Sequence, residues 1–367
     1  MTMIKDRDQK GKAVQFCLTH RWFPQLELEV APGAMLASKV SAVTDLDVFA
    51  SIPDQFAGYR SVVFDCKTKA KESAVNRALW LVGVMERMDA DQGFCILKKG
   101  GMINMDHRLM AGKRGVILLS EDEFDLYAKA VHGPASAISS HVGQLDSWDK
   151  FNNIPKQFPA LRDGVLYARA TYWMIEDATE ACRKTLAMLR SLSTELDPAQ
   201  ASHMALFMDL CALFSRSVAL IVSQLFKAYL HPASSSDLSE ALLIMLYGGR
   251  EAYQHRNELY KMVKARGGEA SVPDLSLPEW ERFLRLARQL LDAPAAVQNI
   301  PLILREVGFA MLNGDSSLTF AKSLCVESPQ AARFSVLVTD YLAKAARLPP
   351  EFGTLSDNAL ISLQPVK

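Results

Sequence analysis

The chain has 367 residues, of which 49% are hydrophobic and 22% charged, and its 41 basic and 41 acidic side chains cancel. These values describe a soluble globular protein long enough for two domains, with no global charge signal for nucleic acid. Six scattered cysteines without a CxxC pair argue against a disulfide or zinc framework and favour reduced thiols in a cytoplasm.

The chain opens with a polar stretch that lacks the apolar core of a signal peptide, and short apolar strands then alternate with helical patterns up to about residue 135. Strands are indicated by alternating or short apolar runs, and helices by apolar residues that recur every three or four positions. The predicted elements are a helix at 12–22, strands at 26–30, 44–50 and 61–67, a helix at 69–91, strands at 93–99 and 115–120, and a helix at 121–131. Their order predicts an α/β layer architecture for residues 1–135.

Glycine, serine, proline and asparagine then interrupt the pattern, and we predict a linker at 136–160. Residues 161–350 have helical periodicity almost throughout, which predicts an all-α domain, and the tail at 351–367 is expected to be irregular. The most apolar stretch, 204–230, contains two charged residues, so we expect a buried helix there and no membrane span.

Acidic residues interrupt two of the predicted strands, TDLDVFA at 44–50 and SVVFDCK at 61–67. Side chains two residues apart share one face of a strand, so Asp65 and Lys67 are expected to point the same way. If the two strands pair as a hairpin, Asp47 lies close to Asp65 and Lys67. Two carboxylates can hold a hard cation such as Mg²⁺, and a neighbouring lysine can orient water and offset phosphate charge. The combination fits metal-assisted hydrolysis of a phosphodiester.

The succession of TDLDVFA and SVVFDCKTK, followed by an amphipathic helix, resembles the signature of the PD-(D/E)XK, or restriction-endonuclease-like, nuclease superfamily. The resemblance covers about residues 12–130 and implies the α-β-β-β-α-β core of that fold. It also implies that Asp47 and Asp65 bind Mg²⁺ or Mn²⁺ and that Lys67 is the catalytic lysine. Nothing after residue 150 is explained by it.

Many members of that superfamily carry a further metal-binding glutamate on the first helix. The corresponding helix of this chain offers Gln15, whereas Glu27 and Glu29 fall on the first predicted strand. We expect Glu29 to complete the metal site, and the alternative is a site with two acids.

Positive charge is locally in excess around the motif, because the segment from Arg60 to Arg114 holds eleven basic and six acidic residues. Basic side chains that neutralise phosphates supply most non-specific DNA affinity, although a solubilising surface is the alternative. The glycine-rich basic stretch at 98–115 is expected to form a DNA-facing loop. The predicted DNA-binding residues are Lys69, Lys71, Arg77, Lys98, Lys99, Lys113 and Arg114.

The sequence therefore predicts a cytoplasmic, Mg²⁺-dependent endodeoxyribonuclease (a hydrolase) that serves a bacterial anti-phage or restriction-type defence system. The helical domain is expected to mediate homo-oligomerisation or docking to a partner protein. In one alternative, a catalytically inactive nuclease fold binds DNA or serves assembly. In the other, the helical domain resembles HEPN ribonucleases through the Arg-x4-His spacing of Arg250 and His255.

Overall fold

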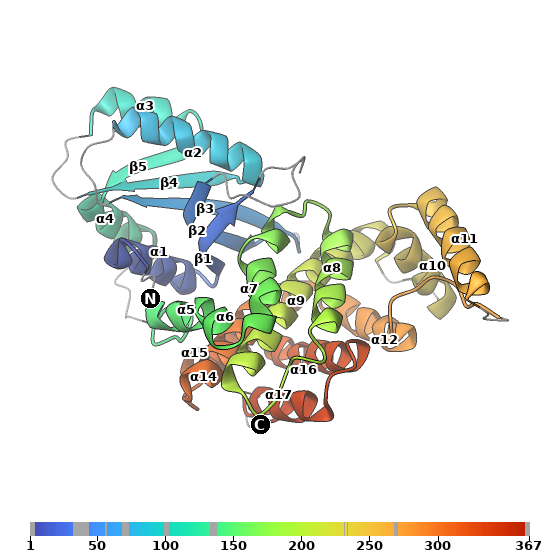
Figure 1. The fold of residues 1–367 in the computed structure, drawn as a ribbon. Helices are drawn as coiled ribbons and strands as arrows, with labels where there is room; N and C mark the ends of the chain where they lie inside the picture. The colour runs from blue at the N-terminus through green and yellow to red at the C-terminus, as the bar shows by residue number, and fades with distance from the viewer. Residues whose placement is uncertain are drawn as a thin grey trace.

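The computed structural model describes residues 4–31, 44–55, 57–67, 73–98, 103–132, 138–230, 232, 234–267 and 271–363. A region of five strands with flanking helices comes first, and a region built of helices follows it and packs against it (Figure 1). This confirms the predicted order of an α/β region before a helical one.

The five strands form one mixed sheet, in which each strand lies beside its neighbour in the chain. They are β1 (Phe23–Val30), β2 (Thr44–Pro53), β3 (Tyr59–Lys67), β4 (Gln92–Leu97) and β5 (Val116–Ser120). The β1–β2 and β2–β3 pairs are antiparallel, so the condition set above, a hairpin of the second and third strands, is met. The β3–β4 and β4–β5 pairs are parallel. Parallel neighbours need a crossover connection. The helices α2 (Ala74–Met88) and α3 (Met105–Gly112) lie in the two crossovers.

Helices cover both faces of the sheet. One face carries α2 and α3, and the other carries α1 and α4 (Figure 1). Phe64 of β3 and Phe94 of β4 are directly opposite and stack with ring centroids 4.8 Å apart, while Phe16 and Phe124 meet them from the covering helices. Strands covered on both sides read as nearly continuous apolar runs, which is why the sequence revealed them. The second pair of helices is α1 (Arg7–Thr19) and α4 (Glu121–His132).

The stretch at 98–115 is not simply the glycine-rich loop that the sequence predicted. It contains α3, and the side chain of its N-cap residue, Asn104, accepts a hydrogen bond of 2.9 Å from the backbone N–H of Asp106. Asparagine is a favoured N-cap because it satisfies one of the free N–H groups of the first turn. Residues 99–102 lie outside the part of the chain that the structure describes.

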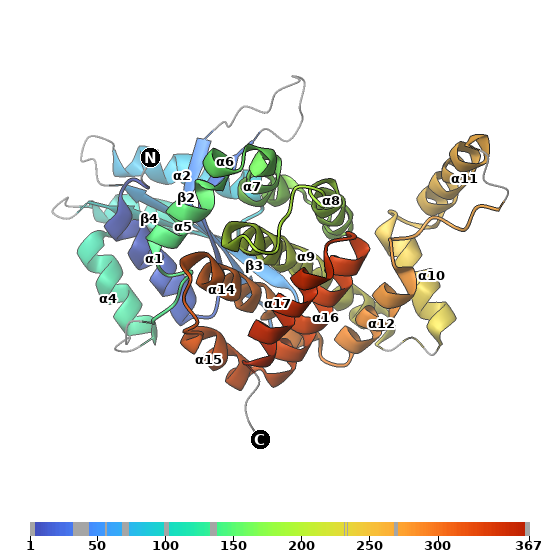
Figure 2. The same ribbon diagram turned by 60° about the horizontal axis from the view of Figure 1, so that its bottom comes forward.

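The helical region surrounds one long helix, α9, which packs against α8, α14 and α16 (Figure 2). The elements of this region are α5 (Leu145–Asn152), α6 (Ile154–Gln157), η1 (Pro159–Leu161), α7 (Arg162–Arg169), η2 (Thr171–Met174), α8 (Ala178–Ser191), α9 (Ala201–Tyr229), α10 (Ser235–Leu246), α11 (Arg250–Arg266), α12 (Trp280–Leu291), α13 (Pro294–Val297), α14 (Ile300–Asn313), α15 (Thr319–Glu327), α16 (Pro329–Ala345) and α17 (Pro350–Ile361). Within the described residues, Ala201–Tyr229 and Pro294–Asn313 are long and apolar enough to span a membrane, but 89% and 78% of their apolar windows are buried. The prediction of a buried helix at 204–230 is confirmed.

Two segments that the sequence left without regular structure are helical. The expected linker at 136–160 contains α5 and α6, and the expected irregular tail contains α17. Trp148 and Phe151 of α5 pack on Phe309 of α14, with ring centroids 4.9 and 5.5 Å apart. Tertiary packing therefore orders a segment whose composition alone indicates a loop.

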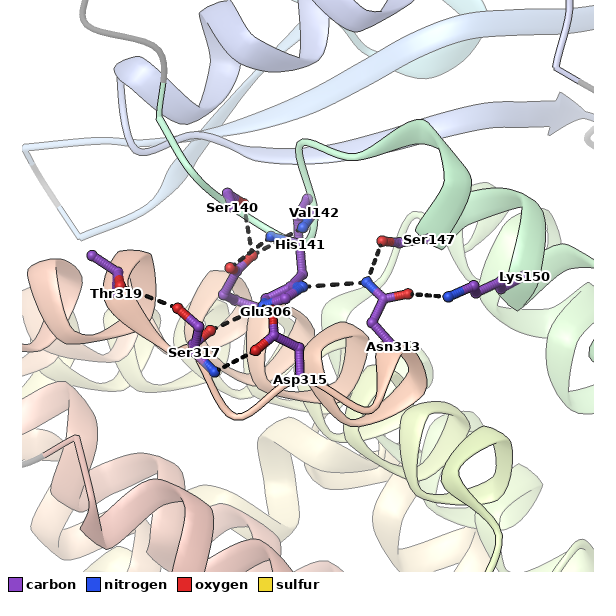
Figure 3. Close-up of polar contacts among 10 residues, drawn as sticks. All are labelled: Ser140, His141, Val142, Ser147, Lys150, Glu306, Asn313, Asp315, Ser317 and Thr319. Carbon is purple, nitrogen blue, oxygen red and sulfur yellow. Dashed lines mark hydrogen bonds and ion pairs between the residues drawn. The ribbon is translucent and has the colours of Figure 1, made fainter.

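A buried glutamate anchors the chain where it passes from the sheet to the helices. The carboxylate of Glu306, which is 1% exposed, accepts hydrogen bonds from Ser140 Oγ (2.7 Å) and from the backbone N–H groups of His141 (2.8 Å) and Val142 (2.9 Å) (Figure 3). Nε2 of His141 lies 2.9 Å from the carbonyl oxygen of Ser317. A buried charge requires such partners, so residues 140–142, which lie between α4 and α5, are tied to α14.

A second buried charge joins the two regions from the side of the sheet. Arg305 of α14 is completely buried, and its Nε donates to Oδ1 of Asp209 on α9 at 2.5 Å. Its Nη1 donates to the carbonyl oxygen of Pro24 on β1, also at 2.5 Å, and its guanidinium carbon lies 4.1 Å from the ring centroid of Phe23. The sheet and the helices consequently share one continuous core.

One helix stands apart from this core. None of the side chains of α11 is buried, and Figure 2 shows α11 projecting beside α10 away from the rest of the molecule. Gly248 and Gly249 precede it with φ angles of 86° and 107°, a left-handed region that favours glycine.

The N-terminal end of α9 gives a prediction about pH. His203 is buried, its Nδ1 accepts the backbone N–H of Asp197 at 2.9 Å, and burial lowers the pKa of its imidazole. The neutral ring is therefore favoured in the folded state. Its contribution to the free energy of unfolding is fully present above the ordinary pKa of about 6.5. As pH falls below that value, the free energy of unfolding should decrease by up to about 1.4 kcal/mol per pH unit until the folded-state pKa is reached.

Urea unfolding at pH 7.5 and pH 5.5 measures this loss. His203→Asn keeps an acceptor near the position of Nδ1 and removes the titrating group, so the difference between the two pH values should shrink. An equal difference in the variant and the natural protein would assign the pH effect to other groups.

Candidate functional site

Three carboxylates are aligned across neighbouring strands of the sheet. In the β1–β2 register, Leu26 lies opposite Val48 and Leu28 opposite Leu46, so Glu27 and Asp47 stand between these two pairs. The β2–β3 ladder ends at the pair Val48 and Phe64, and one residue further along each strand stand Asp47 and Asp65. Directly opposite residues in antiparallel strands are close neighbours, so the pairing brings the two acids of the sequence motif to one end of the hairpin.

Asp47 binds to the backbone of the motif itself. Its side chain is 4% exposed, and its Oδ2 accepts the backbone N–H of Cys66 at 2.6 Å. Cys66 is the residue between Asp65 and Lys67, so the acid of β2 contacts the Asp-Cys-Lys segment of β3. The other oxygen, Oδ1, lies 2.9 Å from Nζ of Lys10.

Lys10 was not predicted as a site residue. It is 3% exposed, and its Nζ forms ion pairs with both Asp47 and Glu27. Burial by itself would lower the pKa of Lys10, but the two carboxylates outweigh burial and raise that pKa above its ordinary value. The ammonium group therefore remains charged between the two acids. On the first helix, where many members of the superfamily carry a glutamate, this lysine reaches the site, whereas the amide group of Gln15 lies beside Gly143.

The sequence contains a signal that could have revealed Lys10. The buried side of α1 includes Ala13, Val14 and Cys17, and Lys10 lies three, four and seven residues before them on the same face. A lysine in an apolar stripe needs a buried partner of opposite charge.

Asp65 is held by a different cation. It is 1% exposed, and Arg77 of α2 donates from Nε to its Oδ2 and from Nη2 to its Oδ1, both at 2.5 Å. The guanidinium carbon of Arg77 lies 3.7 Å from the ring centroid of Trp80. Two parallel hydrogen bonds to one carboxylate form a strong and geometrically specific pair. Arg77, which the sequence predicts to bind DNA, neutralises one of the two motif acids in this structure.

The cysteine between the motif residues is not a nucleophile in this environment. Burial raises the pKa of the Cys66 thiol, and the negative charges of Asp47 and Asp65 raise it further. A thiol must ionise to react, so Cys66 remains neutral and acts through its backbone N–H.

Glu29, the expected third acid, points to another partner. Its Oε1 lies 3.5 Å from Nη2 of Arg169, on α7. Glu29 and its cross-strand neighbour Asp45 line a cavity of about 360 Å³, together with Lys10 and Glu27. Glu27, not Glu29, is thus the acid of β1 that shares a cation with Asp47, and the cavity gives a route toward that group.

The predicted basic residues do not all lie together. The side chain of Lys67 and the residues Lys69, Lys71 and Lys99 lie outside the described part of the structure. Lys98 is exposed just after β4, at the same end of the sheet as the C-terminal end of β3, near Asp65. Lys113 and Arg114 are exposed just before β5, which runs parallel to β4, so they lie at the opposite end of these strands from Lys98.

Arg250 and His255, the candidate ribonuclease pair, are exposed on α11. Arg250 forms an ion pair of 2.7 Å with Glu240 of α10. Neither side chain lies in a buried environment that would change its reactivity.

The chain matches no protein-family model, and comparisons with curated proteins and with solved structures also give no match. The chemistry of the site is therefore argued from its own residues. Among the described residues, no group of three or more histidine, cysteine, aspartate or glutamate side chains is gathered to hold a metal ion. The oxygens of Asp47 and Asp65 are the ligand type that Mg²⁺ prefers, but the two carboxylates currently bind Lys10 and Arg77.

Proposed function

We propose that the N-terminal region has a restriction-endonuclease-like fold and that the protein is a Mg²⁺-dependent nuclease that hydrolyses DNA phosphodiester bonds. The observation that supports this best is the hydrogen bond from the Cys66 N–H to Asp47, which joins the acid of β2 to the Asp65–Lys67 segment of β3. The order α1-β1-β2-β3-α2-β4 agrees with the core of that superfamily.

Asp47 and Asp65 would hold the Mg²⁺ or Mn²⁺ ion. When bound, the ion would supply Lewis acidity toward the phosphodiester and lower the pKa of a water molecule. Lys67 would orient that water and stabilise the negative charge that develops on the phosphate.

Lys10 and Arg77 have a role in the same scheme. Two buried carboxylates are costly without compensating charge, and these two cations provide it in the absence of metal. A bound metal ion would replace the positive charge of Lys10 and Arg77 beside the carboxylates. The phosphate group of the substrate would offer negative oxygens to which these two side chains would then pair. The planar guanidinium of Arg77 suits phosphate as well as it suits carboxylate.

The biological setting is proposed by analogy with nucleases that carry an unrelated helical partner domain. We propose a cytoplasmic effector or subunit of a bacterial anti-phage or restriction-type defence system. The helical region would provide homo-oligomerisation or docking to a protein that controls cleavage.

Cleavage of plasmid DNA by the full chain in the presence of Mg²⁺ tests the proposed activity. Asp65→Asn and Lys67→Met should each reduce the rate by about 10²-fold or more, because each removes a group that acts on the transition state. Asp45→Asn, which changes a nearby exposed acid, is the matched control and should retain activity. Cleavage that survives unchanged in Asp65→Asn would exclude the proposed site.

A second function is favoured by the ion pairs that Asp47 and Asp65 make with Lys10 and Arg77. If Lys10 and Arg77 are permanent partners of Asp47 and Asp65, the fold serves as a DNA-binding or assembly subunit without catalysis. Fluorescence anisotropy with labelled duplex DNA would then show binding that weakens with salt, while no cleavage occurs. Metal-independent RNA cleavage that is lost in His255→Ala would instead support the ribonuclease alternative.

A further inference from the structure

A second cavity, of about 660 Å³, lies where the sheet meets the helical region. Its aromatic wall comes from both regions, with Phe49 on β2, Tyr59 on β3, and Tyr172 and Trp173 on η2. The hydroxyl group of Tyr59 donates to the carbonyl oxygen of Gln298 at 2.9 Å, which fixes that ring against the helices. The cavity is distinct from the Asp47–Asp65 site, because it lies toward the other end of β2 and β3.

Arg216 of α9 also lines this cavity, and its surroundings are unusual for a half-buried cation. Its guanidinium carbon lies 5.3 Å from the ring centroid of Trp173, 5.4 Å from that of Tyr59 and 5.9 Å from that of Tyr172. Its Nε donates to Ser51 Oγ at 2.8 Å. Within the residues that the structure describes, its two terminal nitrogens have no hydrogen-bond partner and no carboxylate pairs with it.

Two other arginines with little exposure are each paired with a carboxylate. Arg305 binds Asp209, and Arg77 binds Asp65. Aromatic faces attract a guanidinium group and hold it in place, but they carry no full negative charge to pair with it. Arg216 is therefore preorganised to bind an anion that enters the cavity, with rings beside it on which a planar group can stack.

The mouth of the cavity has the opposite charge. Glu86, Asp89 and Asp91 are exposed there, and Glu176 is exposed and lies 3.7 Å from Arg87. These carboxylates accept hydrogen bonds from hydroxyl or amino groups but repel further negative charge. The polarity of the cavity thus favours a ligand with one anionic group at its inner end and hydrogen-bond donors at its outer end.

We propose that this cavity binds a small organic anion that combines one phosphate or carboxylate group with an aromatic ring, such as a nucleoside monophosphate. The anionic group pairs with Arg216, and the ring packs against Tyr59 and Trp173. Hydroxyl or amino groups of the ligand meet the carboxylates at the mouth. This binding does not depend on the proposed nuclease activity.

Titration of the full chain with AMP tests the proposal, with heat release and tryptophan fluorescence as the two measurements. We expect binding with one site per chain and quenching of the fluorescence of Trp173, which Trp173→Phe removes. Adenosine and inorganic phosphate should each bind roughly tenfold to hundredfold more weakly than AMP, because each lacks one of the two interactions. ATP should also bind more weakly than AMP, because its additional charges approach the acidic mouth.

Arg216→Gln should weaken AMP binding by roughly tenfold to hundredfold, whereas Arg285→Gln, a change at an exposed arginine of α12, should leave it unchanged. Arg216→Lys keeps the charge and serves as a second variant if the glutamine variant does not fold. The proposal is overturned if AMP gives neither heat nor quenching at millimolar concentration with folded protein. It is also overturned if both Arg216 variants bind AMP like the natural chain, or if inorganic phosphate binds as tightly as AMP.

Discussion

Replacement of Asp209 by alanine should lower the free energy of unfolding by about 3–5 kcal/mol, because it leaves the charge of Arg305 buried without its counter-ion. Asp209 and Arg305 have side chains that are 3% and 0% exposed, so water cannot take over the lost interaction. The carbonyl oxygen of Pro24 would remain as a partner, but it carries no full charge. Urea unfolding followed by circular dichroism measures the loss.

Two further variants show whether buried charge is the cause. Glu180→Ala breaks an exposed pair with Lys184 on α8 and should cost no more than about 1 kcal/mol. The double variant Asp209→Leu with Arg305→Met replaces the buried pair by apolar side chains and should recover most of the loss. If Asp209→Ala costs no more than Glu180→Ala, the buried pair contributes no more to stability than an exposed pair does.

Replacement of Lys10 by methionine should also lower the free energy of unfolding by about 3–5 kcal/mol, because it leaves buried negative charge without its cation. Here the carboxylates of Asp47 and Glu27 lose the ammonium group that both of them share. Methionine is close to lysine in shape, so the packing of α1 on the sheet is retained while the charge is removed. Unfolding in EDTA measures the full loss.

Addition of Mg²⁺ to the Lys10→Met variant separates the two proposed functions. If the freed carboxylates hold a divalent cation, the variant should gain about 1.4 kcal/mol when Mg²⁺ is at ten times its dissociation constant, and the natural chain should gain less. If Mg²⁺ has no effect on the variant, the carboxylates serve only as structural partners, and the non-catalytic function is favoured. Lys12→Met is the matched control, because Lys12 lies on the same helix and pairs with Asp125 at a partly exposed position.

The strands and the long helices could be predicted because their periodicity directly reflects burial. SVVFDCK is apolar because β3 is covered on both faces, and the Met204–Leu230 stretch is apolar because α9 lies at the centre of the helices. Short helices gave no such signal. α5, α6 and α17 are ordered by the surfaces on which they pack, and proline at the start of α17 looks the same in a loop as in a first helical turn.

The candidate site was predictable only within single strands and neighbouring strands. Asp47 and Asp65 could be placed together because a hairpin brings their strand ends into register. Their partners could not, because Lys10 and Arg77 come from α1 and α2, and contact between a helix and a strand depends on tertiary packing. That Glu27, and not Glu29, shares a cation with Asp47 could not be predicted for a local reason: Glu27 has a φ angle of 54°, outside the range of an extended strand.

The exposed helix α11 is a suitable position for a label or a tag. This helix has no fully buried side chain, and apart from its own backbone hydrogen bonds it is held by a few surface pairs and by the packing of Tyr253 on Tyr247. We expect its amide hydrogens to exchange with solvent long before those of α9, and proteases to cut there while the core remains folded. A fluorescent label or an inserted tag on α11 should therefore report on assembly or ligand binding without disturbing either cavity.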